Sequence, residues 1–225
     1  MLFKKPLFIV PLLFVLAAPV AASLVAFSDN LLRSIAQRYS NDAPKRLMVW
    51  QRLIYDMRNS DAPATIRQDA TNETLALRKI NAFFNQVPYQ TDIQHWGKED
   101  YWATPVEMLS SFAGDCEDYS IAKYLSLKEL GVPIERLRIT YVRAVERNES
   151  HMVLAYYPTP DGEPWIMDNL IKEFRPASQR KDLEPVFSFN EDDLWIPSGP
   201  TQRGGASGVR LWRELLEKLE REKRM

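Results

Sequence analysis

Cys116, the only cysteine of the chain, is the first candidate for chemistry and lies in the run Gly114-Asp115-Cys116-Glu117-Asp118-Tyr119. We predict that Asp115 caps a helix that begins at Cys116, with Asp118 as the reciprocal acid of a capping box. The free backbone amides at a helix start stabilise an anion and therefore favour the nucleophilic thiolate. An unpaired thiol in an exported protein also indicates a reactive group.

A nucleophilic thiol needs a base, and the chain has two histidines, His95 and His151. His151 opens the apolar run Met152-Val153-Leu154-Ala155-Tyr156, which predicts a buried strand that holds the imidazole rigidly. His95 lies in an aromatic loop, where a structural or exposed position is favoured. Asp168 ends the apolar run Trp165-Ile166-Met167 and can orient an imidazole from a neighbouring strand. Cys116, His151 and Asp168 are thus the candidate nucleophile, base and orienting acid.

The elements that must position these residues begin with helices. Apolar residues recur at helical spacing from Asp29 to Tyr39, from Leu47 to Met57 and from Thr71 to Asn85. The aromatic stretch between Pro88 and Pro105 indicates an ordered loop against a cleft. The helix that starts at Cys116 is expected to stop at Gly131-Val132-Pro133.

Strands follow the helices along the chain. The expected strands are 137–145, 151–157, 165–168 and 186–190, separated by polar or Pro-Gly breaks. Helices followed by consecutive strands predict an α+β fold with a largely antiparallel sheet. Past Gly204-Gly205 a last amphipathic helix is expected, either docked on the domain or fraying.

The N-terminus is predicted to be a signal peptide, residues 1–22. Lys4 and Lys5 precede an apolar stretch, and Val20-Ala21-Ala22 suits signal-peptidase cleavage before Ser23. We therefore expect a periplasmic protein; retention as an uncleaved anchor is the alternative. The remainder, 23–225, is predicted to be one domain: a helical part (23–88), a catalytic core (89–200) and a C-terminal helix (207–225). With 29 basic and 30 acidic residues, the composition argues against nucleic-acid binding.

Four blocks of sequence carry a family resemblance over about half of the chain, roughly Tyr89 to Ile196. The blocks are Asp100-Tyr101-Trp102-Ala103-Thr104-Pro105-Val106-Glu107, Gly114 to Tyr124, His151-Met152-Val153-Leu154 and Met167-Asp168-Asn169-Leu170. They resemble the bacterial transglutaminase-like cysteine proteinases, which include the LapG-type periplasmic proteases. The resemblance implies a papain/transglutaminase-like core that hydrolyses peptides through an acyl-enzyme, with Cys116, His151 and Asp168 as the triad. The Cys116 amide would hold the oxyanion together with an upstream donor; Trp102 is one candidate, although core packing is favoured for it.

The resemblance also implies a substrate and a regulator. The expected substrate is a large surface adhesin, cut in its N-terminal region so that it is released and the biofilm disperses. The expected partner is an inner-membrane receptor of the LapD type that responds to cyclic di-GMP. Composition and spacing reveal neither of these proteins.

The acids around Cys116 pose an electrostatic problem. Asp115, Glu117 and Asp118 are like charges beside a group that must become negative, so they raise its pKa. A divalent cation would neutralise them, and oxygen-only ligands favour calcium. The resemblance implies calcium dependence, with Asp115 and Glu117 matching the acids that flank the family's cysteine. Asp118 is a third candidate ligand, although capping alone also explains it.

Two other classes of function stay open at this stage. An acyltransferase of the transglutaminase or arylamine N-acetyltransferase type uses the same triad, but an amine takes the acyl group in place of water; export argues against a coenzyme A substrate. A non-catalytic protein that keeps the scaffold to bind a receptor is the third class. The presence of Cys116, His151 and Asp168 together argues against it.

Overall fold

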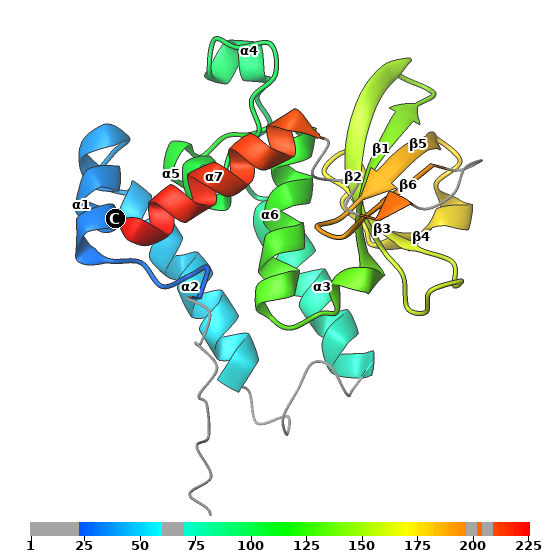
Figure 1. The fold of residues 1–225 in the computed structure, drawn as a ribbon, viewed down its shortest axis with the longest axis horizontal. Helices are drawn as coiled ribbons and strands as arrows, with labels where there is room; N and C mark the ends of the chain where they lie inside the picture. Colours follow the sequence, from blue (N-terminus) through cyan, green and yellow to red (C-terminus); the bar gives the residue numbers. More distant parts are fainter. Residues whose placement is uncertain (1–22, 60–69, 197–201, 204–208) are drawn as a thin grey trace, which may run out of the picture.

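The computed structural model describes residues 23–59, 70–196, 202–203 and 209–225. The predicted signal peptide, residues 1–22, and the Gly204-Gly205 break lie outside the described residues. Helices occupy one side of the molecule and a sheet the other (Figure 1). The helices are α1 (Asp29–Arg38), α2 (Ala43–Asn59), α3 (Ala70–Phe84), α4 (Asp92–His95), α5 (Pro105–Ser111), α6 (Cys116–Glu129) and α7 (Arg210–Arg224), with 3-10 turns at Ile134–Arg136 and Ala177–Gln179.

The described strands form one antiparallel sheet in the order β4-β3-β2-β1-β5-β6-β7. They are β1 (Leu137–Ala144), β2 (Glu149–Tyr156), β3 (Trp165–Met167), β4 (Arg175–Pro176), β5 (Leu183–Phe189), β6 (Asp193–Trp195) and β7 (Gln202–Arg203). The predicted α+β fold with an antiparallel sheet is confirmed. The short strands β4, β6 and β7 were not predicted, nor was the pairing of β5 with β1 on one side and with β6 on the other.

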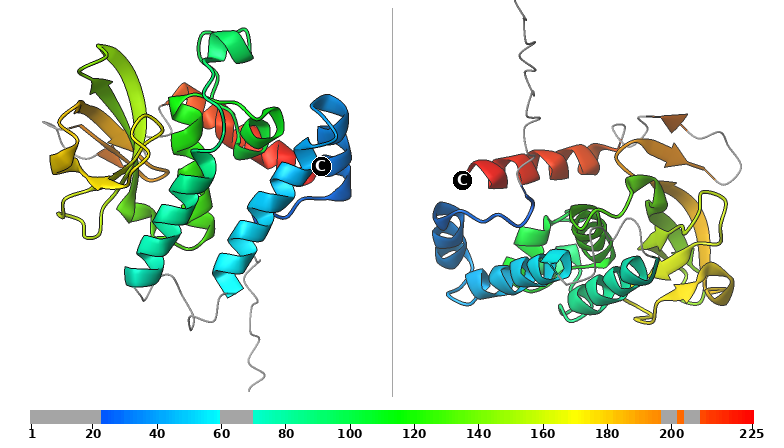
Figure 2. Two further views of the ribbon diagram at one scale, coloured as in Figure 1. Left: turned by 180° about the vertical axis from the view of Figure 1, so that it is seen from behind. Right: turned by 90° about the horizontal axis from the view of Figure 1, so that it is seen from below.

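Helix α6 is the centre of the structure. It packs on β2 and lies between α2 and α3 on one side and α7 on the other (Figure 2). Every residue from Asp118 to Leu127 is buried, which is the expected state of a helix without a polar face. Fully buried Trp50 of α2 donates from its indole Nε1 to Ser126 Oγ at 3.0 Å. The start of α6 is thus held in a rigid core.

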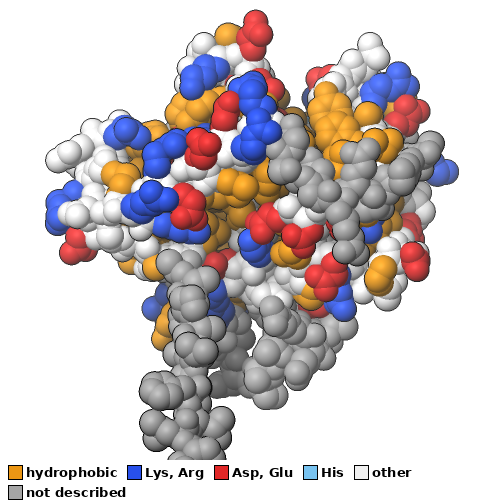
Figure 3. Space-filling model, in the orientation of Figure 1, with side chains coloured by type: hydrophobic (Ala, Val, Ile, Leu, Met, Phe, Trp, Pro, Cys, Tyr) orange, Lys and Arg blue, Asp and Glu red, His pale blue; other side chains and the backbone are white. Residues whose placement is uncertain are grey.

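The C-terminal helix α7 is docked on the domain. Trp212, Leu215 and Leu219 are buried, and the Trp212 ring packs edge-on against Tyr124 and Phe189. Its outer face is charged, and basic and acidic side chains are interspersed over the face that α7 crosses (Figure 3). Among the described residues, no helix combines the length and apolar character that crossing a bilayer requires.

Candidate active site

Cys116 is the first residue of α6, as the sequence predicts. Asp115 is the N-cap and forms a capping box with Asp118, whose Oδ2 accepts a hydrogen bond from the Asp115 amide at 3.3 Å. Gly114 directly precedes this turn, at a position where the neighbouring side chains leave no room for a Cβ atom. A Cβ atom there would lie 2.9 Å from Asp118 Oδ2 and 3.2 Å from Met108 Cε. The helix start is therefore fixed by the packing of Asp118 beneath it.

The Cys116 thiol lies between an acid and the histidine strand. Its Sγ donates to Glu117 Oε2 at 2.9 Å and accepts a hydrogen bond from the backbone amide of Met152. Burial raises the pKa of the thiol well above its ordinary value, and the Glu117 and Asp115 carboxylates raise it further. A helix start alone was expected to lower this pKa. Without a cation, burial and the neighbouring acids outweigh that effect.

His151 and Asp168 form a buried hydrogen-bonded pair. His151 Nε2 lies 2.8 Å from Asp168 Oδ1, and both side chains are at most 4% exposed. Because Met152 follows His151 directly in β2, the contact of its amide with Cys116 places the thiol beside the residue next to His151. Asp168 follows β3 and also accepts from the Leu170 amide at 3.0 Å. The structure therefore brings the three predicted residues to one place, from α6, β2 and the end of β3.

Arg180, which the sequence did not single out, completes the surroundings of Asp168. Its Nη2 lies 2.6 Å from Asp168 Oδ2 and 2.8 Å from Asp182 Oδ2, and its side chain is 1% exposed. Burial raises the pKa of Asp168, but the hydrogen bond and charge of His151, the Leu170 amide and Arg180 together bring it below its ordinary value. Lys123 of α6 adds a second buried cation, whose pKa burial lowers to about 7 although Asp168 opposes the shift.

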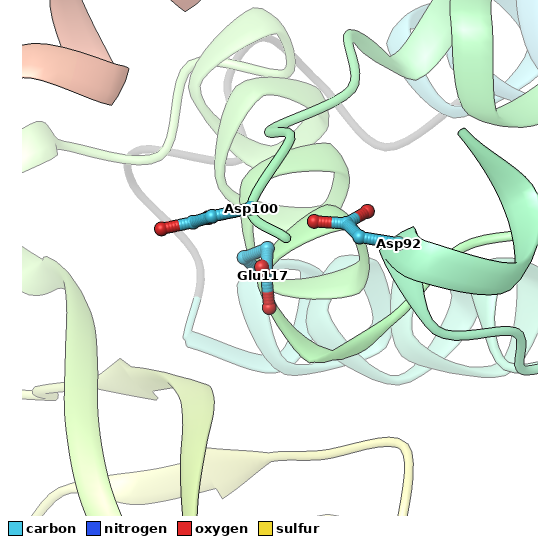
Figure 4. A group of neighbouring side chains, drawn as sticks. All are labelled: Asp92, Asp100 and Glu117. Carbon is cyan, nitrogen blue, oxygen red and sulfur yellow. The ribbon is translucent and has the colours of Figure 1, made fainter. Parts of the chain in front are cut away.

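A group of acids surrounds the other side of the thiol. One carboxylate oxygen from each of Asp92, Asp100 and Glu117 lies within 4.8 Å of the others, and so do oxygens of Asp92, Asp115 and Asp118. Figure 4 shows the first three side chains, which come from α4, the loop that follows it and the first turn of α6. Asp92 and Asp100 were not among the predicted ligands. They lie in the aromatic loop, whose position against the helix start no local pattern encodes.

The acid group has the chemistry of a cation site. Burial first, and then the acids around it, raise the pKa of Asp115 to about 10; burial is also the main cause that raises the pKa of Asp92 to about 6. Within the described part of the chain, no hydrogen bond reaches the buried Asp92 Oδ1 or Asp115 Oδ1. Both oxygens of Asp118, by contrast, accept backbone hydrogen bonds, from Ala103 at 2.7 Å and from Asp115. Asp92, Asp100, Asp115 and Glu117 fit a hard divalent cation, and Asp118 mainly fixes the backbone around them.

The rings of Trp102 and His95, in the aromatic loop, have packing positions. Trp102 is 7% exposed, stacks on Phe189 and hydrogen-bonds through its side chain to Asp100. It therefore has a structural position, in line with the favoured expectation. His95 packs edge-on against Trp96 at 4.3 Å, and burial lowers its pKa. Its position is also structural.

An α+β fold with a thiol at a helix start beside a histidine-bearing strand is the architecture of the transglutaminase-like thiol enzymes. The sequence pattern of the bacterial transglutaminase-like cysteine proteinases matches residues 54–182. The chain belongs to this family and is a cysteine protease. No curated protein sequence matches the chain.

Solved structures of LapG from Legionella pneumophila are similar over most of their length. One is 37% identical, covers 88% of this chain and 99% of its own, and gives a TM-score of 0.69. The EGTA-treated form is 37% identical with coverages of 88% and 100% and a TM-score of 0.71. The calcium-bound form is 36% identical with coverages of 88% and 99% and a TM-score of 0.69.

Proposed function

We propose that the chain is a calcium-dependent periplasmic endopeptidase that uses Cys116, His151 and Asp168 as its catalytic triad. The observation that carries the proposal is the convergence of these residues at the start of α6: the 2.8 Å bond between His151 and Asp168, and the contact of the Met152 amide with Cys116 Sγ. The acid group beside the thiol supports the calcium requirement.

Each side chain of the proposed triad has a distinct role. Asp168 engages His151 Nε2, which leaves Nδ1 to take the thiol proton. The thiolate attacks the peptide carbonyl carbon, the C–N bond breaks, and the protonated imidazole gives its proton to the leaving amine. His151 then activates a water that hydrolyses the thioester and regenerates the thiol. The Cys116 amide, which has no partner within the helix because of its position in the first turn, can donate to the oxyanion.

Calcium would be held by Asp92, Asp100, Asp115 and Glu117, with Asp118 as a further candidate. Bound calcium supplies positive charge that offsets the acids and so favours the ionised thiol. The chain's own residues leave this need unmet, because the acids raise the thiol pKa and the cations Arg180 and Lys123 lie on the Asp168 side. The calcium-bound and EGTA-treated forms of the similar Legionella LapG support the assignment.

The proposed substrate is the N-terminal region of a large surface adhesin, whose cleavage releases it and promotes biofilm dispersal. The proposed partner is a LapD-like inner-membrane receptor that responds to cyclic di-GMP. Both follow from the resemblance to LapG-type proteases, and the predicted signal peptide supports the periplasmic location.

A cleavage assay tests the function directly. Purified protein (residues 23–225) is incubated with the N-terminal fragment of a large adhesin from the same cell, in calcium or in EGTA, and products are mapped by mass spectrometry. We expect calcium-dependent cutting by wild type and none by Cys116→Ala, which removes only the thiol. Cutting by Cys116→Ala would refute the nucleophile assignment, and undiminished cutting in EGTA would refute the calcium requirement. Transfer of the acyl group to an added amine would favour the transglutaminase-type alternative.

A further inference from the structure

We propose that Lys218 of the C-terminal helix is a positioning residue for the cation site, acting through the loop segment 101–104. The inference rests on the proposed calcium site and extends it to a helix that supplies none of the ligands. The segment lies between α7 and the acids, and each of its residues is held from one side or from both.

From the α7 side, Lys218 contacts the segment at Tyr101 and Trp102 and the following helix α5 at Glu107. Its Nζ donates to the backbone carbonyl of Trp102, pairs with Glu107 Oε2 at 2.9 Å and lies 3.8 Å from the centre of the Tyr101 ring. The helix anchors this lysine, because Trp212, Leu215 and Leu219 are buried on the same helix. Glu222, one turn further on, accepts from Thr104 Oγ1 at 2.5 Å. The lysine is itself only 14% exposed, so its contacts are largely shielded from solvent.

From the other side, the same segment holds the acids. The Tyr101 amide donates to Asp92 Oδ2 at 2.5 Å, and the Ala103 amide donates to Asp118 Oδ1 at 2.7 Å. The Trp102 side chain hydrogen-bonds to Asp100. Residues 101–103 therefore each direct an N–H group to one of the acids, and the carbonyl of Trp102 accepts from Lys218. A shift of this segment would move the side chains of both Asp92 and Asp100.

The direction in which calcium affinity changes when Lys218 is removed distinguishes a positioning role from a purely electrostatic one. Lys218 is a cation near the acids and lowers the pKa of Asp92, so a purely electrostatic role predicts that its removal strengthens calcium binding. A positioning role predicts weaker calcium binding, because segment 101–104, which holds the ligands Asp92 and Asp100, loses its support. Residues that hold metal ligands in place change metal affinity by about 10–100-fold when they are replaced.

The test is isothermal titration of calcium into the purified, calcium-stripped protein. We expect Lys218→Met to weaken the affinity by about 10–100-fold, and Lys218→Arg, which keeps a charged donor, to recover most of it. Lys223→Met is the matched control: it removes the same charge from the same helix, but within the described residues the ion-pair partner of Lys223 is exposed Glu220. It should bind calcium as wild type does.

The outcomes are distinct. Calcium binding by wild type together with equal or tighter binding by Lys218→Met would overturn the inference and leave the proposed function standing. No binding by wild type would overturn the calcium site itself. If Lys218→Met does not fold in EGTA, Lys218→Gln takes its place, since its uncharged amide lies one bond closer to the backbone and cannot replace the ammonium group at its three contacts. Wild-type calcium affinity of Lys218→Gln would then overturn the inference, and so would an equal loss of affinity in Lys218→Gln and Lys223→Met.

Discussion

Asp168 and Asp115 are buried carboxylates of one site, yet their environments act on them in opposite directions. Asp168 accepts from His151 and Arg180, and its pKa lies below the ordinary value of an aspartate. Asp115 has acids for neighbours, and burial and those acids raise its pKa to about 10. The acid that orients the imidazole thus has a cation of the chain as a direct partner, whereas the main neighbours of Asp115 are other acids.

This difference indicates which half of the site depends on a supplied cation. The histidine half of the site, His151 and Asp168, is complete, because each carboxylate oxygen of Asp168 has a hydrogen-bond partner within the fold. The thiol half is incomplete, because the acids around Cys116 both raise the thiol pKa and leave oxygens without partners. A dependence on calcium is therefore expected to act through the thiol and its flanking acids, and not through the histidine pair.

Removing the imidazole should have the largest effect on the complete half. We expect His151→Ala to lower kcat/KM by about 10²–10⁴-fold, the range that a general base contributes. His95→Ala, in the aromatic loop, is the control and should retain most activity. Steady-state cleavage of a peptide substrate measures both. Comparable losses in the two variants would mean that His151 acts structurally.

Arg180→Met should break the charge balance around Asp168. Loss of one partner of a buried pair costs about 3–5 kcal/mol in the free energy of unfolding. The exposed pair of Arg143 with Glu184 provides the control, since Arg143→Met should cost only about 0–1 kcal/mol. Urea denaturation followed by circular dichroism compares them. If both variants lose the same small amount, the pairing does not hold this half together.

Calcium should stabilise the incomplete half. At a free calcium concentration 100 times Kd, the free energy of unfolding should rise by about 2.7 kcal/mol. Asp92→Asn should lose most of this gain while it still accepts the Tyr101 amide bond, whereas exposed Asp161→Asn should keep it. Thermal denaturation in calcium and in EGTA measures the gain. Full stabilisation of Asp92→Asn would remove Asp92 from the ligand set.

The smallest effect concerns pH. In the calcium-free protein the raised pKa values of Asp92 (about 6) and Asp115 (about 10) mean that protons compete with the cation. Calcium affinity should therefore increase from pH 6 to pH 8, by up to about tenfold per pH unit for each proton displaced. Calcium titrations in two buffers with different protonation enthalpies would reveal the released protons. An affinity independent of pH, with no proton release, would contradict protonated ligands.

Local sequence patterns were sufficient to predict the elements that carry Cys116, His151 and Asp168. Asp115 and Asp118 predicted the helix start at Cys116, and the apolar runs before Asp168 and after His151 predicted the strands that carry them. The roles of these residues in catalysis stay predictions that the assays above address. The family resemblance and the α+β fold are confirmed.

Long-range contacts account for what sequence reasoning missed. Arg180 reaches Asp168 only because of the turns between β3 and β5, and Asp92 reaches the helix start only because its loop folds back over α6. The pairing of β5 with β1 is likewise invisible in strand periodicity, which shows a buried face but not the neighbouring strand. Strands of two or three residues, such as β4 and β6, are too short to show a pattern.

Gly114 has a consequence for the evolution of this fold. The space for its missing side chain is filled by Asp118, whose two oxygens are both hydrogen-bonded, so the crowding cannot be relieved by swinging that side chain away. A lineage that replaces this glycine must also rebuild the turn before its cysteine. A homologue that has lost Gly114 but kept the surrounding core would thus belong to a branch that keeps the fold but has lost the geometry of the active site.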